Sequence, residues 1–409
     1  MFTGNLSIQV TSTLGLIPIK DATIRISNTG TPENTLEVVQ TDSSGQSPQL
    51  SLDAPDPGYS EAPESSVQPY SEYNLEITAP GYEPVSVSGT QILAGTDAIQ
   101  PVEMTPVEVE TAPEEDIVIP DHTLWGEYPP KIPEDEIKPI NETGEIVLSR
   151  VVIPEYIVVH DGVPQDRSAP NYYVKYKDYI KNVVSSEIYA TWSENTIYAN
   201  ILVILSFTLN RVYTEWYRNQ GYDFTITSST AYDQKWMYGR NIYSNISQLV
   251  DSIFANFLSR PGVRQPIFTS YCNGTTATCT GLSQWGSKYL GEQGYTPIEI
   301  VRYYYGNDMY INTATSVSGI PSSWPGYDLT IGSSGEKVRQ LQQQLNRIAQ
   351  NYPALPTLAV DGIYGSNTAN AVRIFQRIFG LPQTGVVDYP TWYKISEVFV
   401  GVSRISEPD

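Results

Sequence analysis

The stretch SENTIYANILVILSFTLNRVYTEW, residues 193–216, predicts the element around which the middle of the chain folds. Ser193 is a favoured N-cap residue, and Glu194 follows it in the first turn of the expected helix. Leu202 and Ile204 make this helix apolar nearly all round, so we expect it to be central and buried. Its apolar run is too short to span a bilayer. One face repeats at the helical spacing of three or four residues: Ile197, Ile201, Leu205, Leu209, Val212 and Trp216.

The ten residues before this helix, VVSSEIYATW (183–192), contain one carboxylate, Glu187, among small and apolar neighbours. Three interpretations are open: a buried structural residue, an exposed residue at a helix end, or the acid of an enzyme. For an arbitrary glutamate the exposed position is the commonest. Choosing between them requires a substrate and a scaffold, which the rest of the chain has to supply.

The acidic residues are concentrated in the first third of the chain, which has 409 residues and a formal net charge of −21. Residues 1–148 contain 25 Asp and Glu against 4 Lys and Arg, whereas residues 149–409 contain 20 of each. A nucleic-acid partner is not expected, because no basic patch is available to neutralise phosphates. The length exceeds that of one ordinary domain, so we expect a multidomain protein.

Residues 1–105 have the pattern of an all-β domain, for which we expect a small antiparallel sandwich. The succession ATIRIS, TDSSGQ and YNLEITAPGYEPVSVSG resembles transthyretin-like modules, a resemblance that implies no catalysis. Five short segments rich in Val, Ile and Thr alternate in polarity between turn residues: LSIQVTS, ATIRISN, LEVVQTD, YNLEITA and EPVSVSG.

Residues 106–149 are acidic, rich in Pro and Glu, and show neither helical nor strand periodicity. Such a segment buries too little to order itself, so we expect an extended linker. Linkers of this kind are also preferred sites of proteolysis. A cut near residues 148–151 would detach the part of the chain that carries the net charge, so an activating protease is an expected partner.

Residues 150–320 show an α+β pattern. The segment VVIPEYIVVH predicts a first strand, and DFTITSST predicts further β structure. Besides the helix after Trp192, two more helices are expected at SNISQLVDSIFANFL (244–258) and TPIEIVRYYYG (296–306).

Residues 327–400 predict a three-helix bundle. Ser334 would cap its first helix, and Gly380 would stop its second. Tight turns are expected at Asp361-Gly362 and at Gly365, with Thr368 at the start of a helix. The apolar faces of the two helices are Val338, Leu341, Leu345 and Ile348, and Ala371, Val372, Phe375 and Phe379.

This last unit resembles the peptidoglycan-binding type 1 family. The motifs GSSGEKVRQLQQQLN and VDGIYGSNTANAVRIFQRIFGLPQTGVVDYPTW carry the resemblance. It implies that the unit tethers the protein to peptidoglycan of the cortex or cell wall. The resemblance places the binding groove around Asp361, Gly362, Gly365 and Thr368, although most of the motif is also what the three-helix fold needs in order to form.

The middle domain resembles the SpoIID/LytB family, enzymes or relatives of enzymes that cleave peptidoglycan glycan strands. Three blocks carry the resemblance: VVSSEIYATW with the helix after it, YDFTITSSTAYDQKWMYG, and TGLSQWGSKYLGEQGYTPIEIVRYYYG. The resemblance implies a lytic transglycosylase with Glu187 as its catalytic acid. It suggests substrate contacts for Tyr271, Ser283, Gln284 and Gln234, with a structural role for Gln284 equally open.

Two departures from that family concern metal binding. The family's metal-ligating Cys and His are absent from the second block, where this chain has Ser229, Thr230, Ala231 and Tyr232, and no histidine precedes TGLSQWG. An arginine common in the family's central helix falls at Leu205. We therefore expect no metal and no cofactor.

The chain has two cysteines, Cys272 and Cys279, and two histidines, His122 and His160, at spacings that fit no usual zinc site. A tight hairpin could bridge the two cysteines, and two free thiols are equally possible. Nothing near His160 suggests Ser-His-Asp catalysis. Trp285 is either a sugar platform or a core residue, and we expect the core position.

The order of acidic β-rich region, SpoIID-like core and wall-binding unit resembles the SleC-type spore cortex-lytic enzymes of clostridia. This resemblance implies a zymogen that acts in germination, with the first third as its propeptide region. The N-terminus MFTGNLSIQV lacks the pattern of a signal peptide. We expect a protein of the bacterial spore or of the extracellular cell wall, without membrane insertion.

A glycosidase normally places two carboxylates across the bond that it cleaves. By resemblance, a lytic transglycosylase needs one, because the muramic acid 6-hydroxyl attacks its own C1 and forms a 1,6-anhydro product. Glu187 would then act as acid and base, which requires a raised pKa, and apolar neighbours raise it. Two alternatives remain: a muramidase or glucosaminidase with Asp178, Glu194 or Asp233 as second carboxylate, and a non-catalytic wall-binding protein.

Overall fold

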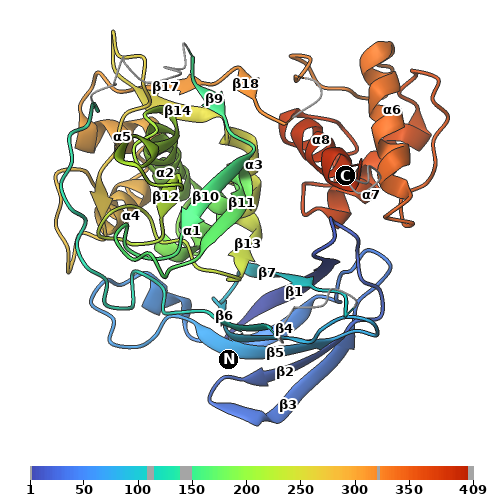
Figure 1. The fold of residues 1–409 in the computed structure, drawn as a ribbon, viewed down its shortest axis with the longest axis horizontal. Coiled ribbons are helices and arrows are strands. Elements are labelled where there is room, and N and C mark those ends of the chain that lie inside the picture. Colours follow the sequence, from blue (N-terminus) through green and yellow to red (C-terminus); the bar gives the residue numbers. More distant parts are fainter. Residues whose placement is uncertain (1, 108–114, 139–149, 320–322, 404–409) are drawn as a thin grey trace.

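The computed structural model describes residues 2–107, 115–138, 150–319 and 323–403. In Figure 1 a β-rich N-terminal region lies at the bottom, a body of helices and short strands lies at the left, and a helical C-terminal unit lies at the right. The prediction of a multidomain chain with a β-rich N-terminal region and a helical C-terminal unit is therefore confirmed.

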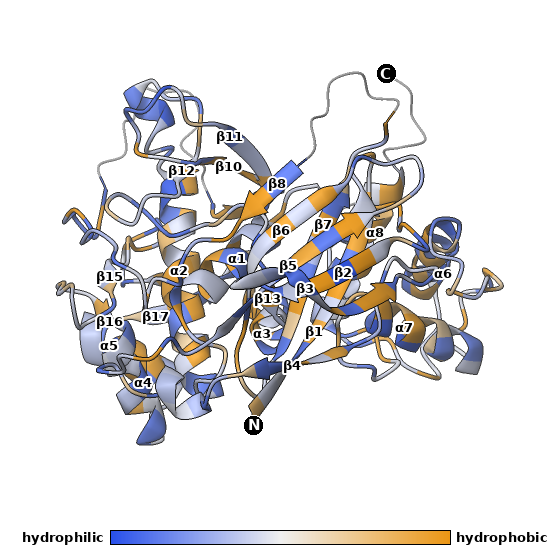
Figure 2. Cartoon of the chain, turned by 90° about the horizontal axis from the view of Figure 1, so that it is seen from below, coloured by the Kyte–Doolittle hydropathy of each residue, from blue (hydrophilic) through white to orange (hydrophobic). Residues whose placement is uncertain are grey.

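Two β-sheets enclose the N-terminal core. Side chains alternate between the two faces of a strand, and Leu6, Ile8 and Val10 of β1 are accordingly fully buried. Figure 2 shows the same alternation of apolar and polar residues along several of these strands. The strands are β1 (Phe2–Ser12), β2 (Thr23–Asn28), β3 (Thr31–Gln40), β4 (Leu50–Ala54), β5 (Ser71–Thr78), β6 (Val85–Ile92), β7 (Asp97–Met104) and β8 (Glu115–Val118), with a 3-10 turn at Pro57–Ser60.

The pairing of these strands differs from the expected antiparallel sandwich in two places. Strand β1 runs parallel to β7, and β6 runs parallel to β8. Parallel neighbours need a crossover connection, and both pairs join strands that are not consecutive in the sequence. The expectation of an antiparallel sandwich over residues 1–105 was wrong for the pair of β1 and β7, and β8 lies in the segment that was expected to be an extended linker.

The N-terminal region shares a sheet with the central domain. The short strand β13 (Ile242–Tyr243) pairs with β7, so that one sheet has the order β13-β7-β1-β4 and the other β3-β2-β5-β6-β8. Next to β13, the side chain of Asn241 exchanges two hydrogen bonds of 3.0 and 2.9 Å with the backbone of Gln91. The two regions are thus joined by main-chain hydrogen bonds as well as by side chains.

The expected central helix is α2 (Glu194–Tyr213), which begins at the predicted N-cap, Ser193. Its side chain accepts a hydrogen bond from the Thr196 N–H at 3.4 Å. The helix ends before Trp216. Against the expectation, its 20 residues are long and apolar enough to cross a membrane by length and composition alone. However, 89% of its apolar stretch is buried inside the protein. Such burial is typical of a core helix.

The second expected helix is shorter than predicted. α3 (Ser244–Ile253) stops at Ile253, and Asn256–Ser259 forms β14, which pairs with β17. The other central elements are α1 (Tyr176–Glu187), α4 (Gln284–Glu292), α5 (Pro297–Tyr305), a 3-10 turn at Arg218–Gln220, β9 (Val152–Ile153), β10 (Tyr156–His160), β11 (Asn171–Lys175), β12 (Ile226–Thr227), β15 (Tyr271–Cys272), β16 (Leu282–Ser283), β17 (Tyr310–Thr313) and β18 (Ser316–Val317).

Residues 119–138, which we name the strap, lie along the central domain. The Thr123 N–H donates to the Ser186 carbonyl at 3.1 Å, the Ile132 N–H donates to the Ala231 carbonyl at 2.6 Å, and the Phe268 N–H donates to the Glu136 carbonyl at 3.0 Å. The expectation that this acidic segment does not order was wrong here, because the strap's partners are remote in the sequence. Of the proposed cut site at 148–151, residues 148 and 149 lie outside the described residues.

The C-terminal unit consists of α6 (Glu336–Ala349), α7 (Ser366–Ile378) and α8 (Tyr389–Ser403), the expected three helices. The cap of α6 is Gly335 rather than Ser334, and α7 begins at Ser366, before Thr368. Helix α8 lies near the central domain (Figure 1), where Glu397 pairs with Lys177 at 2.8 Å.

Candidate active site

Glu187 is the last residue of α1 and is only 3% exposed. One carboxyl oxygen accepts a hydrogen bond of 2.7 Å from the backbone N–H of Lys235. The other faces the side-chain amide of Gln284 at 3.4 Å. The neighbouring Val183 and Val184 are fully buried, so the helix carries the carboxyl group into the core of the domain rather than into solvent.

Burial is the main reason why the pKa of Glu187 is raised above its ordinary value of 4.5. The position at the C-terminal end of a helix acts in the same direction, because the helix dipole disfavours negative charge there. The charge of Lys131 opposes the shift most strongly, followed by the Tyr271 hydroxyl, the Lys235 N–H and the Gln284 amide. The net shift of the pKa is upward, the direction that a general acid requires.

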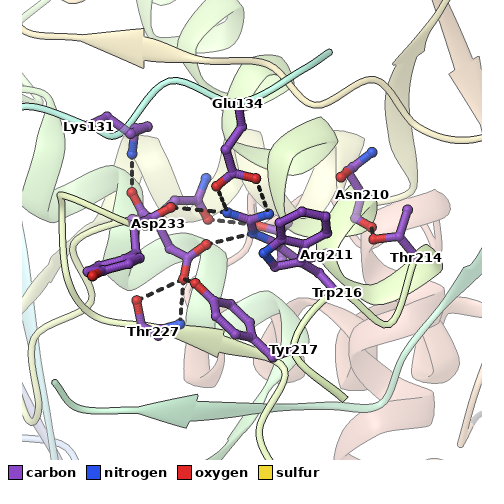
Figure 3. Close-up of polar contacts among 12 residues, drawn as sticks. Lys131, Glu134, Asn210, Arg211, Thr214, Trp216, Tyr217, Thr227 and Asp233 are labelled. Carbon is purple, nitrogen blue, oxygen red and sulfur yellow. Dashed lines mark hydrogen bonds and ion pairs between the residues drawn. The ribbon is translucent and has the colours of Figure 1, made fainter. Parts of the chain in front are cut away.

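The loop that presents the Lys235 N–H is held by Asp233, which is fully buried. Its carboxylate accepts hydrogen bonds from Arg211 at 2.7 Å, from the Tyr217 hydroxyl at 2.6 Å, and from the backbone and hydroxyl of Thr227 at 2.9 and 2.7 Å (Figure 3). One hydrogen bond to Oδ1 and three to Oδ2 therefore fix this carboxylate in place. Arg211 carries no recognisable motif in the sequence, and our reading of the sequence missed this network.

Glu187 lines a pocket with an empty volume of about 430 Å³. Glu187 is the one carboxylate among the residues that line it. Lys131 from the strap, Tyr271, Asn273, Thr230 and Gln284 contribute to the wall. The pocket thus brings together two of the four predicted substrate residues, Tyr271 and Gln284.

The other two predicted substrate residues lie elsewhere. The hydroxyl of Ser283 caps α4 by accepting from the Gly286 N–H at 3.0 Å. Gln234 is buried, where its side-chain oxygen accepts from the Tyr179 and Thr208 hydroxyls at 3.1 and 2.7 Å. Neither residue lines the pocket. Both support elements that do, so their geometry fits a structural role.

Tyr271 faces the carboxyl group from β15. Its hydroxyl is buried, is near enough to lower the pKa of Glu187, and has no well-aligned hydrogen bond among the described residues. Burial and the charge of Glu187 hold the pKa of the Tyr271 phenol well above its usual range. The hydroxyl therefore lies close to the Glu187 carboxyl and the Gln234 side chain, and the Tyr271 side chain lines the pocket.

The two cysteines are joined. Cys272 and Cys279 form a disulfide with a Cα–Cα distance of 6.0 Å. Cys272 itself lines the pocket, so the bridge clips the loop that carries Asn273 and closes one wall. The spacing left a disulfide and two free thiols equally open, and the structure contains the disulfide.

The three candidates for a second carboxylate do not reach the pocket wall. Asp178 and Glu194 are exposed, the first near the start of α1 and the second in the first turn of α2. Asp233 is buried but is enclosed by the partners described above. The Trp285 ring packs at a tilt against the Trp192 ring, with centroids 5.0 Å apart, and Trp285 is 9% exposed, which is the expected core position.

The histidines have structural partners. His122 stacks on Tyr189 with ring centroids 4.4 Å apart, and His160 stacks on Phe224 at 4.5 Å. Among the residues that the structure describes, no group of three or more His, Cys, Asp or Glu side chains is placed to hold a metal ion.

In the C-terminal unit the predicted groove residues shape a turn. Asp361 accepts hydrogen bonds from the Gln342 side chain at 2.8 Å and from the Ile363 N–H at 2.9 Å. Gly362 has a φ of 76°, which favours glycine. Thr368 is buried beside Gln342. The motif therefore maintains the fold of the turn, and Gln342, which our reading did not single out, is its centre.

Comparison with known proteins supports this unit. Residues 334–395 match the peptidoglycan binding domain family. A 77-residue part of the chain is 43% identical to the zinc D-Ala-D-Ala carboxypeptidase of Streptomyces albus G, covering 19% of this chain and 28% of that protein. The chain thus carries a C-terminal peptidoglycan-binding domain, which indicates a cell-wall-related function.

Similarity to solved structures is limited. The TIE protein of Bacillus anthracis matches 26% of this chain and 17% of its own, with 16% identity and a TM-score of 0.18. The minor pilin GBS52 of Streptococcus agalactiae matches 28% and 49%, with 15% identity and a TM-score of 0.19. Similarity at this level carries no argument about function.

Proposed function

We propose that the protein is a peptidoglycan lytic transglycosylase in which Glu187 is the single general acid and base. The observation that carries the proposal is the pocket: it has one carboxylate, buried and with a raised pKa, in a chain that also has a peptidoglycan-binding domain. The resemblance of the three sequence blocks to the SpoIID/LytB family supports the same activity.

The chemistry needs one group that first gives and then takes a proton. Protonated Glu187 donates to the glycosidic oxygen between N-acetylmuramic acid and N-acetylglucosamine while the C1–O bond breaks. The carboxylate that remains accepts the proton of the muramic acid 6-hydroxyl while O6 bonds to C1. The products are an anhydro-muramic end and a free 4-hydroxyl, and the enzyme is returned to its protonated form.

The alternatives receive less support. A muramidase or glucosaminidase would need a second carboxylate facing the first across the bond, and the pocket wall offers none besides Glu187. The zinc carboxypeptidase activity named for the relative is not proposed, because both cysteines are bridged and both histidines are stacked in the core. A non-catalytic wall-binding protein remains the outcome to test against.

The biological setting is part of the proposal. The acidic first third and the order of domains support a zymogen of the spore cortex, cleaved by an activating protease in germination. The localisation in the spore or the extracellular wall rests on the same resemblance.

The test is mass spectrometry of the muropeptides released from purified cortex peptidoglycan. The full chain is compared before and after cleavage at a specific protease site inserted between residues 138 and 150. Anhydro-muramic ends, absent with Glu187→Gln, are expected. Reducing muramic or glucosamine ends would replace the proposal with a hydrolase, and binding without release would replace it with a wall-binding protein.

A further inference from the structure

The strap forms part of the wall of the Glu187 pocket. Tyr128, Pro129, Pro130 and Lys131 all line it. The Thr230 hydroxyl, which also lines the pocket, donates to the Pro129 carbonyl at 3.2 Å. The two prolines restrict the backbone of this stretch, so the strap meets the pocket as a stiff segment.

Lys131 enters the pocket next to Glu187. Its ammonium group lies 4.7 Å from the centre of the Tyr271 ring and 4.9 Å from that of Phe207, and it donates to the backbone carbonyl of Asp233. Aromatic faces and a carboxylate together make a site for a cation. The strap therefore adds a cationic group to the pocket wall. Burial lowers the pKa of Lys131, and the charges of Glu187 and Asp233 oppose that shift and favour the ammonium form.

Two ion pairs with the central domain hold the strap just after Lys131, and Figure 3 shows the first of them, between Glu134 and Arg211. Glu134 accepts two hydrogen bonds from the Arg211 guanidinium, at 2.8 and 2.6 Å. Glu136 accepts two from Arg260, one of them at 2.8 Å. Bidentate pairs of this kind are among the stronger charged contacts in proteins.

We propose that the strap is a built-in inhibitor, and that Lys131 occupies the subsite where the sugar develops positive charge during cleavage. Cleavage of a glycosidic bond passes through an oxocarbenium-like transition state. The half-buried Lys131 places its ammonium group 4.7 Å from the centre of the Tyr271 ring and within the field of the Glu187 carboxylate, which marks where a positive charge meets both groups. The identity of the substrate in this inference rests on the proposed function. The contact between the strap and the pocket does not depend on that function.

The inhibition has two physical components. The strap belongs to the same chain as the pocket that it lines, so its effective concentration there exceeds that of a free ligand. A glycan strand would have to displace the strap in order to bind. In addition, Lys131 lowers the pKa of Glu187, which favours the ionised form that cannot act as the acid. Departure of the strap removes both components at once.

The experiment uses the full chain with Thr230→Cys as a reporter at the pocket wall. Because the two native cysteines are bridged, the new thiol can be labelled alone. Glu134→Ala with Glu136→Ala loosens the strap, while Arg211 keeps Asp233 and Arg260 keeps Asp308 as ionic partners. The matched control is Glu127→Ala with Asp135→Ala, which removes two exposed carboxylates from the same strap.

The variant with the loosened strap should be labelled about tenfold faster or more, which corresponds to a change of about 1.4 kcal/mol in the free energy of strap opening. It should also release anhydro-muropeptides without proteolysis. An unchanged labelling rate, or an equal rise in the control, would overturn the strap as the cover of the pocket. Faster labelling without release of any muropeptide would keep the cover and overturn the proposed function instead.

Lys131→Met is the second variant, because it leaves both anchors in place. It should increase labelling and release by less than the loosened variant does, since only the contacts inside the pocket are lost. Values equal to those of the unaltered chain would overturn the assignment of Lys131 to the cation site.

Discussion

The pocket at Glu187 and the loop at Asp233 each bury a carboxylate, at 3% and 0% exposure, but they surround it differently. Asp233 is ion-paired with Arg211 and accepts three further hydrogen bonds from Tyr217 and Thr227. Glu187 accepts one short hydrogen bond, from a backbone N–H, and has a second, longer contact with an amide.

This difference shows how one domain separates a structural carboxylate from a candidate catalytic one. A buried charge with a full set of partners is fixed in place, and removal of one partner is costly. A buried carboxyl with few partners is left closer to its neutral form and free to exchange a proton. The four predictions below would each break or sharpen that distinction.

The largest effect is expected for Glu187→Gln on activity. An amide cannot donate the proton that the leaving oxygen requires, and a general acid and base contributes roughly 10²–10⁴-fold to a rate. We expect a loss of that size in anhydro-muropeptide release by the cleaved chain, measured by mass spectrometry. The exposed Glu194→Gln is the control. Release that survives in Glu187→Gln would show that another group supplies the proton.

Asp233→Asn should mainly reduce the stability of the fold, because it removes an ionic partner from the fully buried Arg211. Breaking a buried ion pair costs about 3–5 kcal/mol of stability. We expect the lower end of that range, because Arg211 keeps its ion pair with Glu134. Urea unfolding at pH 7 measures the change, with the exposed Asp178→Asn as control. A loss below about 1 kcal/mol would mean that the Asp233 network does not hold the loop.

Part of this contrast could be predicted from the sequence. Helix α2 and its Ser193 cap follow from local periodicity, and the glycines and turns of residues 327–400 predict the three helices, because the contacts concerned lie close in the sequence. Glu187 was selected by its resemblance to a family motif, and its burial fits the apolar neighbours.

The remainder depends on contacts that no local pattern contains. The strap has the composition of a disordered linker, and its order comes from Arg211 and Arg260, which are 77 and 124 residues away from their glutamates. The pairing of β13 with β7 joins two regions that the sequence presents as separate domains. Lys131 follows two prolines in an acidic segment, and nothing in that pattern indicates a pocket.

The stability of Glu187→Gln should depend on pH. The folded protein has a raised pKa at this position, so the unaltered chain loses stability as pH rises through that value, whereas the amide does not. The variant should equal the unaltered chain below about pH 4.3 and become the more stable one towards neutrality, by about 1.4 kcal/mol for each unit of pKa shift. Thermal unfolding from pH 4 to pH 8 measures this difference, and a constant difference would contradict a raised pKa.

The smallest effects are expected for substitution of two buried glutamines. Gln234 belongs to the structural loop that contains Asp233, and Gln284 contacts the Glu187 carboxyl group. Gln234→Leu leaves the buried Tyr179 hydroxyl without its acceptor, whereas the Thr208 hydroxyl keeps the Ile204 carbonyl. The substitution should cost about 1–3 kcal/mol of stability. Gln284→Leu removes a donor that lowers the pKa of Glu187. It should leave stability within about 1 kcal/mol and move the alkaline limb of the pH–rate profile upward, because the acid stays protonated at higher pH. Urea unfolding and rates of muropeptide release separate the two results. A stability loss for Gln284→Leu as large as that for Gln234→Leu, with no movement of the pH limb, would place Gln284 in the same structural class as Gln234.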